Sequence, residues 1–262
     1  MIKMIVTDMD GTLLDDDKNI NKEFHKVYTA LREKGIKFVV ASGRHYSEMH
    51  KYFKPKYDDM IYVAENGGLI IYEDKEIFSS PMDMDYVFKI AEDAMEIEGV
   101  DIILSGEENL YLYNFRNKPI EDLRDFYFNF KVLDNPSDLK EKIYKVSIYN
   151  ENGSDFLAHK LIYDNWADKL NVVSSSLVWT DIHNKGVNKG LAVNVLKDKF
   201  NIKDEEIMVF GDYNNDIEML ELAHHSYAME NASEEIKSIA NFMAKSNNEN
   251  GVLEVIKRIV LL

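Results

Sequence analysis

The chain has 262 residues, of which 45% are hydrophobic and 30% charged, as in a soluble globular protein with one large core or two moderate ones. Its formal net charge of −16 disfavours nucleic acid as a partner, because phosphate-backbone binding needs clustered lysine and arginine. It has no cysteine, which excludes disulfides, thiolate nucleophiles and cysteine-based zinc sites.

The sequence has neither a signal-peptide pattern at its start nor a run of about 20 apolar residues that could span a membrane. We therefore expect a cytoplasmic protein with no membrane partner. The sequence indicates no particular oligomeric state.

Four short apolar runs, each ending in small or polar residues, predict strands that are buried on both faces of a parallel sheet. They are MIVTD ending at Asp8, FVVASG at Ser42, IYVAENGG at Glu65 and IMVFGD at Asp212.

Apolar residues at helical spacing separate these strands. One predicted helix has an apolar face from Ile20 to Leu31 and stops at Gly35, and another runs from Leu191 to Phe200. This alternation is typical of βαβ units, so we predict an α/β fold with a doubly wound, mainly parallel, Rossmann-like sheet. Ligands bind beyond the carboxyl ends of the strands in such sheets.

The sequence pattern changes between about Pro81 and Lys185. Residues 82–185 have few glycines, and the segments LYLYNF and YKVSIYN alternate like half-exposed antiparallel strands. Apolar residues from Phe156 to Ile162 predict a helix. We therefore expect an inserted α+β domain at 82–185, within a core domain made of residues 1–81 and 186–262.

Asp8 and Asp10 follow the first strand and are two positions apart, so in an extended chain both carboxylates face one site. Their mutual repulsion favours a bound cation, and Mg²⁺ is suited to carboxylates together with a substrate phosphate. An EF-hand loop is excluded, because Gly11 comes fourth in the motif rather than sixth.

A second cluster, Asp212, Asn215 and Asp216, follows the last strand. It also fails as an EF-hand, because Ile217 stands where glycine is required and Ala223 where glutamate is required. Alone, such a cluster is more often a turn or a helix cap. The sheet topology brings it near the first aspartate pair.

Two further segments are suited to binding a phosphate group. The hydroxyl of Ser42 and the exposed amide of Gly43 lie at a strand-to-helix turn, where backbone N–H groups bind anions. Lys189 comes where a helix begins, which is unfavourable for a cation and so favours an anionic partner.

In their order and spacing, these four motifs resemble those of phosphatases of the haloacid dehalogenase-like superfamily, and more closely those of its Cof-type subfamily, which resembles sugar phosphatases. The resemblance covers the whole chain, and the insert falls where that subfamily has its cap domain. The motifs are Asp8-Met9-Asp10-Gly11-Thr12, Ser42 in VVASGR, Lys189 in NKG, and Gly211-Asp212 with Asn215-Asp216.

The resemblance implies catalysis through an aspartyl-phosphate intermediate. Asp8 is then the nucleophile, and Asp10 the general acid and base, with a pKa that we expect the nearby carboxylate to raise. The cofactor Mg²⁺ is held by the Asp8 carboxylate, the Asp10 carbonyl and Asp212, with Asp216 acting through water.

The same resemblance assigns Ser42, the Gly43 amide, Lys189 and Asn215 to phosphate binding, and it makes the insert a lid over the substrate. Candidates for contacts with the leaving group are Tyr111, Tyr113, Asn114 and Arg116. Each of these four residues also suits an ordinary strand position in the surface or core of the cap.

Three functions follow from the sequence. The leading one is a Mg²⁺-dependent phosphatase acting on a small phosphate ester, sugar phosphates first, with FMN, pyridoxal phosphate and hexose phosphates all compatible. The alternatives are a phosphomutase on the same scaffold and a non-catalytic sensor of phosphorylated metabolites.

Overall fold

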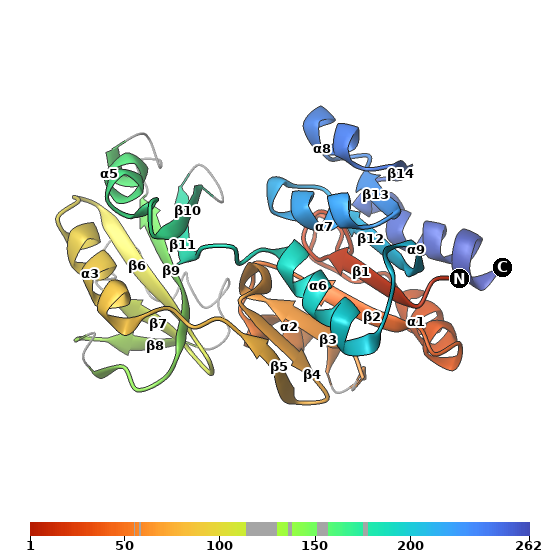
Figure 1. Ribbon diagram of the computed structural model, residues 1–262, viewed down its shortest axis with the longest axis horizontal. Coiled ribbons are helices and arrows are strands. Elements are labelled where there is room, and N and C mark those ends of the chain that lie inside the picture. Colours follow the sequence, from red (N-terminus) through yellow and green to blue (C-terminus); the bar gives the residue numbers. More distant parts are fainter. Residues whose placement is uncertain (55, 58, 114–129, 136–137, 151–156, 175–177) are drawn as a thin grey trace. The chain divides into compact units, whose positions relative to one another are not determined.

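The computed structural model describes residues 1–54, 56–57, 59–113, 130–135, 138–150, 157–174 and 178–262 (Figure 1). It divides into two compact units. The first contains Met1–Arg44, Tyr52–Phe78 and Asn188–Leu262, and the second contains His45–Lys51 and Ser79–Val187. None of the helices in these described residues is both long and apolar enough to cross a membrane.

The first unit is built on an eight-stranded sheet with the strand order β14-β13-β12-β1-β2-β3-β4-β5. From β14 to β3 every neighbouring pair is parallel, and β4 pairs with β3 in the antiparallel direction. The strands are β1 (Met4–Asp8), β2 (Lys37–Ala41), β3 (Ile61–Ala64), β4 (Leu69–Tyr72), β5 (Lys75–Ser79), β12 (Ile207–Gly211), β13 (His225–Met229) and β14 (Phe242–Ala244).

Helices cover both faces of this sheet. Apolar residues of α6 (Lys189–Phe200), α7 (Ile217–Leu222) and α8 (Glu234–Ile239) pack with one set of strand residues in a single core cluster. On the other face α1 (Phe24–Glu33) contacts β2 through the edge-on ring pair Phe24–Phe38, and it also contacts α9 (Gly251–Ile256). Because both faces are covered, β1, β3 and β12 are buried along their whole length.

Shorter elements complete the first unit. A π-helical turn (Lys257–Leu261) follows α9, whereas α2 (Tyr46–Phe53), which follows β2, belongs to the second unit up to Lys51. The 3-10 turns are η1 (Glu65–Gly67), η3 (Asp204–Glu206), η4 (Asn214–Asp216) and η5 (Asn247–Glu249).

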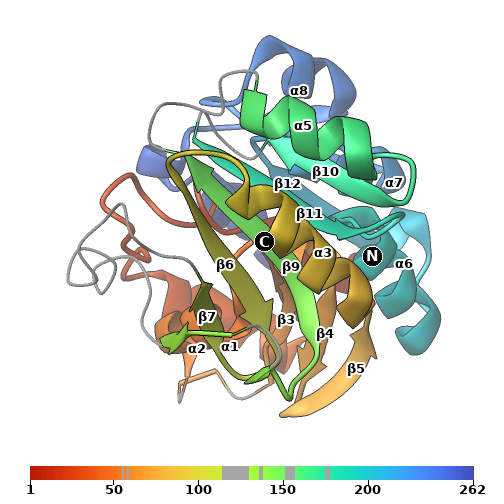
Figure 2. The same cartoon turned by 90° about the vertical axis from the view of Figure 1, so that its left-hand side faces the viewer.

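The second unit has a six-stranded sheet with the order β10-β11-β9-β6-β7-β8. Two helices, α3 (Met84–Met95) and α5 (Leu157–Trp166), lie on one of its faces, as Figure 2 shows. The strands are β6 (Val100–Gly106), β7 (Leu110–Tyr113), β8 (Phe130–Leu133), β9 (Ile143–Asn150), β10 (Leu170–Ser174) and β11 (Trp179–Asn184). All neighbouring pairs are antiparallel except β7–β8.

The predicted fold class is confirmed: an α/β core sheet with an inserted α+β region. Two local predictions were wrong. The first helix begins at Phe24, because Ile20 instead forms a bridge with Leu14 in the loop after β1. The strands β7 and β9 are buried on both faces rather than half exposed, and even Lys145 and Ser147 of β9 are buried.

We expect the core cluster to depend strongly on α6. Replacing the fully buried Leu196 with alanine removes apolar contacts and leaves a cavity, which should lower the free energy of unfolding by about 2–5 kcal/mol. Urea unfolding of the full chain measures this loss. Leu191→Ala, the same change at a half-buried position of the same helix, is the control and should cost less. Equal losses in the two variants would contradict this account of the core.

Candidate active site

The candidate site lies where three parallel strands of the first unit end side by side. Asp8, the last residue of β1, is in register with Ala41 of β2, and the preceding Thr7 is in register with Phe210 of β12. Ser42 and Asp212, the residues that follow β2 and β12, therefore come close to Asp8.

Lys189 is the first residue of α6, and its side chain is completely buried. Asn188 caps the helix by accepting a hydrogen bond from the amide of Leu191 at 2.7 Å. The Lys189 ammonium donates to the Asp8 carboxylate, and to that of Asp216 at 2.6 Å. The cation predicted to be unfavourable at a helix start is thus held by two anionic partners.

Burial alone would lower the pKa of Lys189, but the charges of Asp216 and Asp8 outweigh burial and raise it. The lysine is therefore a permanent cation at the centre of the site. A buried ion pair of this kind has its strongest effect when one partner is lost, because the other charge is then left without compensation.

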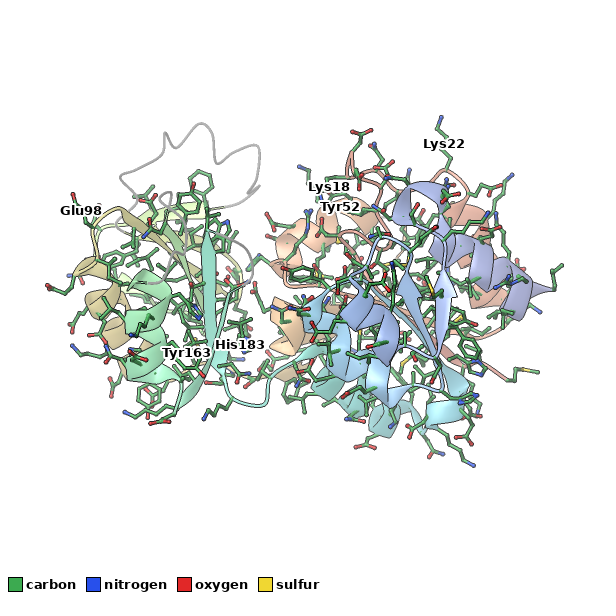
Figure 3. The ribbon with its side chains drawn as sticks, turned by 90° about the horizontal axis from the view of Figure 1, so that it is seen from above. Lys18, Lys22, Tyr52, Glu98, Tyr163 and His183 are labelled. Carbon is green, nitrogen blue, oxygen red and sulfur yellow. The ribbon has the colours of Figure 1, made fainter. Side chains whose placement is uncertain are left out.

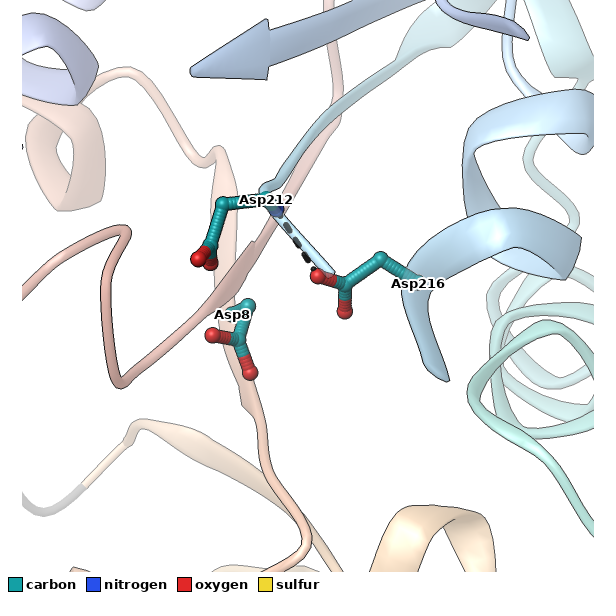
Figure 4. A group of neighbouring side chains, drawn as sticks. All are labelled: Asp8, Asp212 and Asp216. Atoms are coloured by element: carbon teal, nitrogen blue, oxygen red, sulfur yellow. Dashed lines mark hydrogen bonds between the residues drawn. The ribbon is translucent and has the colours of Figure 1, made fainter. Parts of the chain in front are cut away.

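The side chains of Asp8, Asp212 and Asp216 are neighbours (Figure 4). Each offers a carboxylate oxygen, and these oxygens lie within 4.8 Å of one another. Asp216 accepts hydrogen bonds from the amides of Asp212 at 2.9 Å and Tyr213 at 3.1 Å. Thr12 donates to Asp212 at 2.6 Å, so this hydroxyl orders the acidic group.

The charges of this group do not balance. Burial raises the pKa of Asp8 despite the neighbouring Lys189. Burial also raises the pKa of Asp212 to about 6, although the hydrogen bond from Thr12 acts in the opposite direction. Three carboxylates share one ammonium, so a bound cation would relieve the remaining repulsion. Hard oxygen ligands are the donors that Mg²⁺ takes, so these residues fit such an ion.

The close approach of these carboxylates depends on glycine. Gly11 has a positive φ of 76°, and a Cβ at this position would overlap the Asp212 carboxylate. A Cβ at Gly211 would lie 2.5 Å from the Cβ of Asp216. A side chain at either position would displace an acidic residue of the site.

Asp10 has different partners from Asp8. Arg44 binds it with two hydrogen bonds, at 2.6 and 2.7 Å, and Lys18 adds a third at 3.0 Å. Lys18 and Tyr52, whose ring lies beneath the Arg44 guanidinium, are labelled in Figure 3. Burial would raise the pKa of Asp10, but Arg44 and Lys18 outweigh it and lower the pKa. The expected raised pKa is therefore wrong for this structure, because Asp10 pairs with cations instead of facing Asp8.

Two turns form the other side of the site. Ser42 accepts a hydrogen bond from the amide of Arg44 at 3.2 Å, and its own amide donates to Val63 at 2.9 Å. In η4, the side-chain amide nitrogen Nδ2 of Asn215 donates a hydrogen bond to the side-chain oxygen of Asn66 at 2.9 Å. Asn66 also lies against Gly43, so these residues are brought together.

The comparisons with known proteins agree with this arrangement. The model of the haloacid dehalogenase-like hydrolase family matches residues 5–256. The chain belongs to this family. The 5-amino-6-(5-phospho-D-ribitylamino)uracil phosphatase YbjI of Escherichia coli is 33% identical over 99% of this chain and 96% of that protein. A putative phosphatase of Streptococcus pyogenes is 26% identical over 99% of both chains.

Solved structures extend the likeness to the fold. SMU.1108c from Streptococcus mutans has a TM-score of 0.89 and 33% identity, covering 100% of both chains. TM0651 from Thermotoga maritima has a TM-score of 0.87 and 28% identity, covering 99% of this chain and 98% of that one. The resemblance deduced from the four motifs is confirmed, and this member of the hydrolase family is a phosphatase.

Two of the four residues predicted to contact the leaving group, Tyr111 and Tyr113, lie in described parts of the second unit of this phosphatase. Tyr111 is buried in the apolar cluster under α3 and α5, and its hydroxyl donates to Glu141, while burial raises its pKa to about 12. Tyr113 packs against the same cluster. Asn114 and Arg116 lie outside the described residues. The assignment of these four residues to the leaving group stays a prediction.

Sequence reasoning gave no role to two residues that contact the site of this phosphatase. Arg44 stands in the segment VVASGR and Asn66 in the segment IYVAENGG, and neither residue was itself predicted to bind anything. The signal for Arg44 is its place at a strand end opposite two carboxylates. The sequence signal for Asn66 is weaker, because asparagine before glycine indicates a turn without indicating what the side chain binds.

The Gly11 position gives a direct test of the geometry of the acidic group. Gly11→Ala should lower phosphatase activity about 100-fold, because the new Cβ displaces the Asp212 carboxylate and misplacement of about 1 Å can have that effect. Phosphate release from p-nitrophenyl phosphate measures it.

Gly35→Ala is the matched control. Gly35 has a similar φ of 71°, but nothing lies within 4 Å of its added Cβ. Both variants carry the backbone cost of roughly 1–2 kcal/mol for a left-handed residue with a Cβ. Activity in Gly35→Ala should stay within about twofold of the unchanged protein, as expected for a surface substitution. An equal loss in the two variants would attribute the effect to backbone strain.

Proposed function

We propose that this phosphatase hydrolyses small phosphorylated metabolites, sugar phosphates first, through a phosphorylated Asp8, and that it requires Mg²⁺. The observation that carries the proposal is the position of the Asp8 carboxylate. It lies buried at the end of β1, against Lys189 and within reach of Asp212 and Asp216.

In the first step, the Asp8 carboxylate attacks the phosphorus of the ester. Lys189 contacts Oδ1, so we assign the attack to Oδ2. A bond forms between Oδ2 and phosphorus while the ester P–O bond breaks, and the leaving oxygen takes a proton from Asp10. The product is an acyl phosphate, which is more reactive toward water than the original ester.

In the second step, water attacks the phosphorus of the acyl phosphate and Asp10 removes its proton. The bond between Asp8 and phosphorus breaks, which releases inorganic phosphate and restores the carboxylate. Because Arg44 and Lys18 bind Asp10 as a carboxylate here, proton donation requires Asp10 to leave both cations and to take up a proton when the substrate binds. The proton that Asp10 removes from water in the second step then restores this protonated form.

We assign Mg²⁺ to the carboxylates of Asp8 and Asp212 and the backbone carbonyl of Asp10. Asp216 acts through water, since its oxygens already accept from Lys189 and from two backbone amides. When bound, Mg²⁺ neutralises phosphate charge and so permits approach to an anionic nucleophile.

The phosphate oxygens are assigned to Ser42, the Gly43 amide, Lys189 and Asn215. Ser42 follows β2 next to β1, so its hydroxyl is near the nucleophile. Lys189 supplies the positive charge, and the Gly43 and Asn215 amides supply N–H donors. Donors that are already fixed in place stabilise charge in the transition state without reorganising.

Substrate selection is assigned to the inserted region, residues 82–185. Two relatives are named for the phosphate ester 5-amino-6-(5-phospho-D-ribitylamino)uracil: YbjI of Escherichia coli, and YitU of Bacillus subtilis, which is 25% identical over 97% of this chain. Because that compound carries its phosphate on a ribityl chain, these names support a sugar-like phosphate ester. Relatives named as phosphatases also favour hydrolysis over a phosphomutase reaction.

The test is phosphate release from a panel that contains hexose phosphates, FMN, pyridoxal phosphate and 5-amino-6-(5-phospho-D-ribitylamino)uracil. We expect release with Mg²⁺, loss of release with EDTA, and loss of at least about 10³-fold in Asp8→Asn, because the amide is a poor nucleophile. The order of the substrates then identifies the leaving group.

Asp17→Asn is the control for Asp8→Asn, since it makes the same change at an exposed position of the loop after β1 and should leave release unaltered. Release that persists in Asp8→Asn would contradict the assigned nucleophile. Activity that persists in EDTA would contradict the metal requirement. If the panel gives no release, isomerisation of hexose phosphates with a bisphosphate activator is the next assay.

A further inference from the structure

The turn that follows β3 has an unusual backbone. Glu65, Asn66 and Gly67 are three consecutive residues with positive φ, at 51°, 53° and 100°. Residues other than glycine pay about 1–3 kcal/mol for such a conformation, and they keep it where the surroundings impose it. Asparagine tolerates it better than most residues. The surroundings of this turn are the residues assigned to phosphate.

Asn66 contacts three of the residues that are assigned to phosphate binding. Its amide N–H donates to the carbonyl of Ser42 at 3.0 Å, and its side-chain oxygen accepts from Nδ2 of Asn215 at 2.9 Å. Its side-chain amide also lies so close to Gly43 that an added Cβ there would be 3.0 Å from its oxygen. One side chain thus connects the turn after β2 with the turn after β12.

The next residue brings the same turn against α6. A Cβ on Gly67 would overlap the carbonyl oxygen of Asn188, which caps the helix that starts with Lys189. All the groups assigned to the phosphate therefore touch the turn or adjoin a residue that does.

We propose that Asn66 is a positioning residue that fixes the orientation of the Asn215 amide toward the substrate phosphate. The inference rests on the proposed function, because it takes Asn215 as a phosphate donor. An amide nitrogen has two N–H groups. One of those on Asn215 bonds to Asn66, and the other is left for the phosphate.

Without the acceptor on Asn66, the Asn215 amide is free to rotate by half a turn. Rotation would present its carbonyl oxygen to an anionic phosphate, so an attractive contact would become a repulsive one. A residue that only shaped the turn would have no such effect on Asn215. The two roles can therefore be separated by experiment.

The experiment is a double-mutant cycle with Asn66→Gly and Asn215→Ala. Glycine accepts the positive φ and removes the whole side chain, including its amide. From the usual strength of one hydrogen bond, we expect Asn66→Gly to lower kcat/KM for p-nitrophenyl phosphate about fivefold and to weaken inhibition by inorganic phosphate similarly. Asn215→Ala should lower kcat/KM at least about tenfold. The double variant should match Asn215→Ala within about twofold, since its target is already absent.

Two further variants complete the design. Asn201→Gly is the matched control, an exposed asparagine with a φ of 52° at the end of α6, and it should leave both readouts unchanged. Asn66→Asp retains an acceptor and tolerates the same backbone, so Asn215 stays oriented. It should keep most of kcat, while its added negative charge raises KM and weakens inhibition by phosphate. Thermal unfolding of each variant verifies that it is folded.

The outcomes separate the inference from the proposed function. If the losses of the two single variants multiply in the double variant, Asn66 acts independently of Asn215 and the inference is wrong. A large loss of kcat in Asn66→Asp would also overturn it, since Asn66 would then touch the phosphate itself. If Asn215→Ala has no effect, Asn215 is not a phosphate donor, so both this part of the assigned phosphate site and the inference are wrong.

Discussion

The candidate site depends on one buried contact, the ammonium of Lys189 between the carboxylates of Asp8 and Asp216. These three residues come from the start of α6, the end of β1 and the turn η4, and each charge is costly to bury alone. Removing one partner of a buried ion pair typically costs about 3–5 kcal/mol, because the remaining charge has no compensation. The contact therefore fixes where the helix starts relative to the sheet, as well as the position of the nucleophile.

A single ammonium does not neutralise the group, and the excess negative charge is what makes the site suitable for a cation. Burial raises the pKa of both Asp8 and Asp212, and the charges of neighbouring carboxylates act in the same direction, so ionising all the carboxylates together is unfavourable in the protein alone. The fold holds them together through backbone amides, through the hydroxyl of Thr12, and through a glycine at position 11 that leaves room for Asp212. The repulsion is thus maintained by the structure, as expected of a site built to bind an ion.

The sheet and the buried part of the site could be predicted from the sequence, because both follow from short-range patterns. An apolar run such as IMVFG has to be buried on both faces, and parallel strands bring their carboxyl ends to one edge. Asp8 and Asp212 were therefore placed together without any structure. The pairing of Asp10 with Arg44 depends on which way two long side chains turn, and no spacing encodes that. The burial of Lys145 in β9 was missed for a similar reason, since alternation along a strand does not reveal whether its second face is covered.

The two aspartates of the first motif differ in the way that their proposed roles require. Asp8 is 6% exposed and is held by a cation that is completely buried, so its position is expensive to change. The Asp10 side chain is 35% exposed, and those of Arg44 and Lys18 are 23% and 51% exposed. Exposed ion pairs contribute about 0–1 kcal/mol to stability. The bidentate contact of Asp10 with Arg44 is stronger than a typical exposed ion pair, but it lies where water can replace it. A nucleophile has to stay fixed while a proton donor has to exchange partners. Because Asp8 is buried and Asp10 is partly exposed, two residues only two positions apart meet these two different requirements.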